Sequence, residues 1–172
     1  MGPRSNLPHP LQQTLQARLQ NARDVALLAV GSELRGDDAV ALRVAALLQA
    51  DPNAPLNLHV FVGSNAPENC TGPIRQLIPS HVLVIDAAEL GKEPGAVELL
   101  DPSHLAGVSF CTHALPLSVI IDYIIAACPG CEVVVMGVQP GTLEFGRALT
   151  PSVEAAAQDI AALLCSTVAA AG

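Results

Sequence analysis

Three side chains of the types that bind metal ions stand at the ends of apolar or helical segments. They are Asp38, Asp86 and His113. Asp38 follows the apolar residues 25–30, Asp86 ends a second apolar segment, and His113 comes just before a helical stretch. In an open parallel sheet, ligands bind beyond the carboxyl ends of the strands. Two carboxylates and one imidazole suit a divalent transition metal and leave room for ligands from outside the protein, so we expect a shared metal site.

Each of the three residues also has a simpler interpretation. Asp37 and Asp38 open a predicted helix, where acidic residues commonly act as caps. Asp86 could accept hydrogen bonds from loop amides, because a charge at the end of an apolar strand must be paired, bonded or bound to a metal. A lone histidine such as His113 is more often structural than a ligand. These alternatives stay open on the residues alone.

The elements that must position these residues alternate between short apolar segments and helical patterns. The pattern predicts an α/β protein with one domain and three layers, in which a mostly parallel sheet of about five strands is flanked by helices. The strands are expected at residues 25–30, 56–62, 82–86, 96–100 and 132–138, and the main helices at 11–22, 38–50, 117–128 and 151–168. Thr150 is a favourable N-cap and Pro151 a favourable first helical residue.

The first 23 residues are expected to form an N-terminal extension, and residues 24–172 the main α/β domain. Within the extension, Leu15 and Leu19 form a narrow apolar stripe, which predicts an accessory helix that covers a surface. Such a stripe could also support weak self-association.

Composition excludes several classes of function. The chain has 172 residues and a formal net charge of -8, which argues against nucleic-acid binding. No secretory signal is recognisable, and no apolar run reaches the length of a membrane span, so we expect a cytoplasmic protein.

Its five cysteines are then expected to be reduced thiols. Cys128 and Cys131 have redox spacing, but they follow a helix instead of opening one, which favours a simple Pro-Gly turn. A nucleophilic pair of Cys111 with His113 lacks a third orienting group.

Five short motifs, in register from Val25 to about Leu164, resemble those of the nickel–iron hydrogenase maturation endopeptidases, in the branch that serves formate-hydrogenlyase (hydrogenase 3 type) enzymes. They are Val-Gly-Ser-Glu-Leu-Arg-Gly-Asp-Asp at residues 30–38, Ser-Asn-Ala-Pro-Glu-Asn at 64–69, Leu-Val-Ile-Asp-Ala at 83–87, Thr-His-Ala-Leu-Pro-Leu at 112–117 and Gly-Val-Gln-Pro at 137–140. The sequence departs from the family in having Ala39 and Ala41 where glycines are usual, and Ser32 in place of asparagine.

The resemblance implies a hydrolase with a twisted, mostly parallel sheet that removes a C-terminal extension from the hydrogenase large-subunit precursor after nickel insertion. The nickel-contacting residues of the family fall on Asp38, Asp86 and His113, and the precursor is expected to supply the nickel. In one version of the mechanism the metal is a catalytic Lewis acid. In the other version, the three residues recognise nickel and the acids activate water, as in an aspartic-type enzyme. Ala39 and Ala41 leave one alternative open, a non-catalytic checkpoint or assembly factor that binds the large subunit. A thiol oxidoreductase is a third hypothesis.

Overall fold

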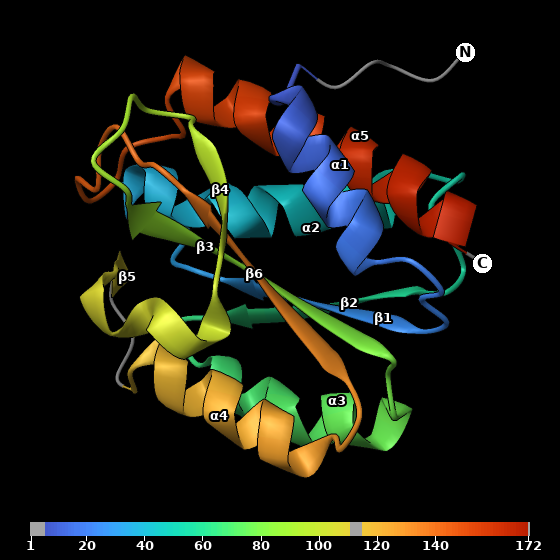
Figure 1. The fold of residues 1–172 in the computed structure, drawn as a ribbon. Coiled ribbons are helices and arrows are strands. Elements are labelled where there is room, and N and C mark those ends of the chain that lie inside the picture. The colour runs from blue at the N-terminus through green and yellow to red at the C-terminus, as the bar shows by residue number, and fades with distance from the viewer. Residues whose placement is uncertain (1–5, 111–114, 172) are drawn as a thin grey trace.

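The computed structural model describes residues 6–110 and 115–171, which form a mixed six-stranded sheet between two layers of helices (Figure 1). The strands are β1 (Val25–Val30), β2 (Leu58–Ser64), β3 (His81–Glu89), β4 (Val97–Leu100), β5 (Ser109–Phe110) and β6 (Glu132–Val138). The α-helices are α1 (His9–Arg18), α2 (Val40–Ala50), α3 (Thr71–Leu77), α4 (Leu117–Ala127) and α5 (Pro151–Ala171). Three 3-10 helices join them: η1 (Gly36–Ala39), η2 (Pro67–Cys70) and η3 (Pro102–Gly107).

The sheet has the order β2-β1-β3-β6-β4, with β5 pairing only the end of β3. The first four strands of this order are parallel, and β4 is antiparallel at the edge. The predicted α/β class and the mostly parallel sheet are therefore confirmed, with the short β5 as an unexpected sixth strand. The edge strand β4 lies where the sequence predicts it.

Alternate residues along each strand pack on opposite faces of the sheet. In β3, Leu83 and Ile85 join a core with residues of α1, α2 and α5, whereas Val82 and Val84 join a second core with residues of α3 and α4. Figure 1 shows these two helical layers above and below the sheet. Because side chains alternate in a strand, Asp86 belongs to the same face as Val84, the face that α4 covers.

The order in which strands are added to the sheet reverses between the neighbouring strands β1 and β3. We call this place the reversal point. After β1 the chain crosses through α2 to β2 on one side, and after β3 it leads toward β4 and β6 on the other side. Since α2 and α4 cover opposite faces, the connections from these two neighbouring strands leave on opposite faces. This is the position at which open α/β sheets bind their ligands.

Strand β3 is longer than the sequence predicts. The sequence places its end at Asp86, but the strand continues to Glu89, because Ala88 and Glu89 pair with β5. Asp86 itself pairs with Gly137 of β6. The prediction that Asp86 closes the strand is thus wrong, and the residue lies within a hydrogen-bonded ladder.

Helix α1 is shorter than expected and packs deeply. Leu15 and Leu19 are fully buried in the core that α2 and α5 line. Arg18 bonds the carboxylate of Glu132 and donates to the carbonyl of Val133 at 3.1 Å, which ties the helix to the start of β6. The separate accessory role of residues 1–23 stays a prediction, but this burial changes the expected result of removing them.

Deleting the residues before Asp24 is expected to destabilise the domain strongly, because burial of each leucine contributes about 1.5–3 kcal/mol. A milder probe is Leu15→Ala, which should lower the free energy of unfolding by about 2–5 kcal/mol. Urea denaturation checks both changes, with the exposed neighbour Gln16→Ala as the control. A truncated chain as stable as the full chain would show instead that α1 is a true accessory.

Helix α5 corrects the expectation that no apolar segment reaches the length of a membrane span. Within the part of the chain that the structure describes, it alone is long and apolar enough to cross a membrane by length and composition. It carries Glu154 and Asp159, and half of its apolar window is buried. Its residues Ile160 and Leu164 are fully buried in the core with α1 and α2. The burial explains the apolar composition of this helix.

Candidate active site

Asp38 is held in place by a close contact between two stretches of backbone. It lies in η1, directly after β1, and is fully buried. Gly31 has φ of +144°, and a Cβ built on it would lie 1.9 Å from the carbonyl oxygen of Asp38. Only glycine permits this approach, which folds the 31–38 loop back against the end of β1. Because η1 also packs against β3, Asp38 lies at the reversal point between β1 and β3.

Asp86 lies at the same, carboxyl end of the parallel strands, on β3, which pairs with β1 on one side and β6 on the other. It comes one residue after the last β1–β3 pair, which joins Ala29 to Ile85. Its side chain is fully buried, like that of Asp38. Two fully buried carboxylates on touching elements are costly in free energy, because burial penalises the charged form. Such pairs are characteristic of sites that bind a cation or hold a proton.

Asp37, the neighbour of Asp38, has a different part in the site. Its Oδ2 accepts hydrogen bonds from the backbone N–H of Gly141 at 2.7 Å, the N–H of Thr142 at 3.0 Å and the hydroxyl of Thr150 at 2.9 Å. Its Oδ1 accepts from the N–H of Thr150 at 2.6 Å. Asp37 therefore fixes the 139–150 loop and the start of α5 to the 31–38 loop. It does not cap α2, whose N-cap is Ala39.

The two alanines that replace family glycines fit the backbone without strain. Ala39 has φ of -80°, and Ala41 lies inside the regular helix α2. Neither residue needs the left-handed conformation that glycine would provide. The start of α2 thus keeps an ordinary right-handed path in this chain.

Gln139 fixes a third loop at the carboxyl end of the parallel strands. Its Oε1 accepts from the N–H of Leu90 at 2.7 Å and of Lys92 at 3.2 Å, and its Nε2 donates to Glu89 at 3.0 Å. The Gly-Val-Gln-Pro motif therefore joins the end of β6 to the loop that follows β3. The sequence singles out this motif but does not indicate the bonding role of Gln139.

His113 and Cys111 lie outside the described residues, so their placement stays a prediction. On either side of them, Phe110 pairs with Ala88, two residues beyond Asp86, and α4 packs on the face to which Asp86 belongs. Across residues 6–110 and 115–171, no three His, Cys, Asp or Glu side chains gather closely enough to hold a metal ion. A metal at Asp38 and Asp86 therefore needs a donor from elsewhere.

The Cys128–Cys131 pair has the character of a structural turn. Burial, with a smaller effect of the Cys128 sulfur, raises the pKa of Cys131 to about 11. Reactive thiols have a lowered pKa, since the thiolate is the nucleophile. The thiol-oxidoreductase hypothesis consequently has no support at this pair.

Comparisons with known proteins find similar sequences and a similar fold. A family model of the hydrogenase maturation protease HycI matches residues 42–167. The hydrogenase 3 maturation protease of Escherichia coli is 33% identical over 135 residues, which cover 78% of this chain and 84% of that protein. A putative hydrogenase maturation protease of Methanocaldococcus jannaschii is 29% identical over 141 residues, or 78% of this chain and 83% of that protein. The crystal structure of a nickel–iron hydrogenase maturation protease HycI from Thermococcus kodakarensis matches 91% of this chain and 99% of its own, with a TM-score of 0.82 and 26% identity. The chain therefore belongs to the hydrogenase maturation protease family HycI.

Proposed function

We propose that this protein is the endopeptidase that removes the C-terminal extension of a nickel–iron hydrogenase large-subunit precursor once nickel has been inserted. The observation that carries the proposal is the pair of fully buried carboxylates, Asp38 and Asp86, at the reversal point between β1 and β3. Both belong to elements fixed by backbone contacts. Such preorganised charge favours recognition of a cation that a substrate brings into the site.

In this proposal Asp38, Asp86 and His113 are the donors that this chain offers to nickel held by the precursor. Carboxylate and imidazole groups are suitable ligands for nickel, and three protein donors leave positions for the ligands of the precursor itself. Bound nickel supplies the chemistry of a Lewis acid. The two carboxylates orient the precursor and accept a proton from the attacking water. Nickel is thus part of the substrate, and cleavage is coupled to its presence.

The alternative of a non-catalytic assembly factor had one motivation, the replacement of two glycines by Ala39 and Ala41. Both alanines adopt ordinary helical or near-helical backbone angles next to Asp38. The replacement therefore gives no reason to expect a distorted or inactive site. We accordingly favour the enzyme.

The test incubates the purified protein with a large-subunit precursor, loaded with nickel in one arm and free of nickel in the other. Mass spectrometry follows the loss of the C-terminal extension. We expect cleavage only in the nickel-loaded arm, because without nickel the donors of this chain have no cation through which to hold the precursor. Equal cleavage in both arms would refute nickel recognition. Binding without cleavage in either arm would favour the assembly factor.

A further inference from the structure

The 31–38 loop, which carries Asp38, and the 139–150 loop that is bonded to it have an exposed apolar surface. Leu34 has 58% of its surface exposed and Phe145 has 77%, although the chain contains only four aromatic residues. The N–H of Gly146 donates to the carbonyl of Leu34 at 2.8 Å, so the tips of the two loops are bonded to each other. We call the surface formed by Leu34, Arg35 and Phe145 the docking rim.

Hydrogen bonds and close backbone contacts join the two loops of the docking rim. Asp37 binds the 139–150 loop through both carboxylate oxygens, and its own N–H donates to the carbonyl of Thr142 at 2.9 Å. Gly36 has φ of +52°, and a Cβ built on it would lie 2.7 Å from the carbonyl oxygen of Thr142. A surface that is already ordered loses little conformational entropy on binding. This is the property expected of a preformed interface.

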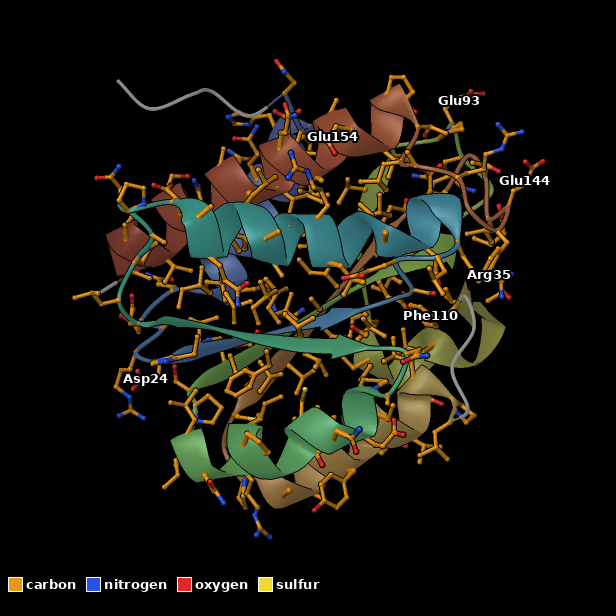
Figure 2. The ribbon with its side chains drawn as sticks, turned by 180° about the vertical axis from the view of Figure 1, so that it is seen from behind. Asp24, Arg35, Glu93, Phe110, Glu144 and Glu154 are labelled. Carbon is orange, nitrogen blue, oxygen red and sulfur yellow. The ribbon has the colours of Figure 1, made fainter. Side chains whose placement is uncertain are left out.

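The docking rim also includes a positive charge, that of Arg35. Arg35 has no ion-pair partner among residues 6–110 and 115–171, whereas nearby Arg147 is paired with Glu144 at 2.9 Å. Figure 2 shows Arg35 and Glu144 at one end of the molecule and Asp24, which precedes β1, at the other. An unpaired guanidinium on a chain with a net charge of -8 is complementary to a carboxylate. Aromatic and arginine side chains are also the commonest energetic centres of protein interfaces.

We propose that the docking rim binds the folded body of the large-subunit precursor, through an apolar side chain of the precursor against Leu34 and Phe145 and a carboxylate of the precursor on Arg35. The inference rests on the proposed function. A stable protein interface covers about 800 Å² per partner, so we expect the contact with the precursor to extend beyond the proposed catalytic residues to the surface beside them. The docking rim is continuous with the loop that carries Asp38.

The test measures tail cleavage of nickel-loaded precursor at varied precursor concentration. Phe145→Ala is expected to raise KM by about 30-fold and to leave kcat within about threefold, because the rim binds ground and transition states equally. Arg35→Gln should raise KM less and should weaken its dependence on salt. Leu56→Ala is the matched control, since Leu56 is 98% exposed just before β2, at the opposite end of the sheet. Its KM should stay at the wild-type value.

Wild-type KM in the Phe145→Ala and Leu34→Ala variants would overturn the inference, and so would a loss of kcat at unchanged KM. A wild-type dimer in sedimentation that Phe145→Ala dissociates would assign the rim to a second copy of this chain, and would also overturn it.

If the wild type cleaves no precursor, the proposed function fails. The inference is then decided separately by calorimetric titration of the precursor into wild type, Phe145→Ala and Leu56→Ala: weaker binding by Phe145→Ala alone supports it, and any other outcome overturns it.

Discussion

Asp86→Asn is expected to abolish removal of the precursor tail, with a loss of about 100-fold or more, while the protein stays folded. Asparagine keeps the volume of the buried side chain in the β3–β6 ladder but removes the charge that binds nickel in the proposed function. Changes to residues that only support a metal ligand already cost about 10- to 100-fold, so loss of a ligand should cost at least as much.

Cleavage rates and thermal melts of the same preparation check this result. The melting temperature should stay within a few degrees of the wild type, since about 1 kcal/mol corresponds to 2–4 °C in a chain of this size. Asp122→Asn removes an exposed carboxylate from α4 and serves as the matched control for loss of charge. Full activity of Asp86→Asn would remove this residue from the site, and a collapsed melt would make its role structural.

Asp37→Ala should give the opposite combination, a large loss of stability with activity reduced in proportion to unfolding and loop disorder. The Asp37 carboxylate accepts four hydrogen bonds from the 141–150 region. A hydrogen bond to a charged group contributes about 1.5–3 kcal/mol, so losing these four bonds together should cost at least about 3–5 kcal/mol. The melting temperature should therefore fall by about 6–20 °C.

Hydrogen exchange locates this effect. In Asp37→Ala the amides of Gly141, Thr142 and Thr150 should lose protection, whereas those in β1 and β3 should change only with global stability. Asp38→Asn, one residue further along, is the informative comparison, because it should lose cleavage and keep the melting temperature. Glu33→Ala controls for an exposed acid on the same loop. Identical behaviour of Asp37 and Asp38 variants would contradict the division of roles.

The sequence could predict the layers of the fold and the end of the sheet at which Asp38 and Asp86 lie, because apolar periodicity specifies which segments are buried strands. It could not predict the length of β3. A charged residue after four apolar ones indicates the end of a strand, yet β3 continues past Asp86, since β5 and β6 supply the partners of residues 86–89. Those pairings depend on tertiary structure, which local pattern does not contain.

The sequence likewise could not predict that Asp37 and Asp38 have different roles. Both are acids at the start of a helical segment, and local rules give both the same capping role. The partners of Asp37 lie 104 to 113 positions further along the chain, so no local pattern reports them. The sequence does not reveal the docking rim for the same reason. Leu34 and Phe145 come together only because hydrogen bonds of Asp37 join the two loops.

The contact between Gly31 and the carbonyl of Asp38 gives the site a kind of stability that ion pairs lack. Steric exclusion has no charge for salt to screen and no proton to lose. The backbone position of Asp38 should therefore be the same at low and high ionic strength, and in a protonated or an ionised site. Any substitution at Gly31 would push against the chain itself, since a Cβ would lie 1.9 Å from that oxygen. In the proposed function, Asp38 can therefore change its charge without any change in the steric contact that fixes its backbone.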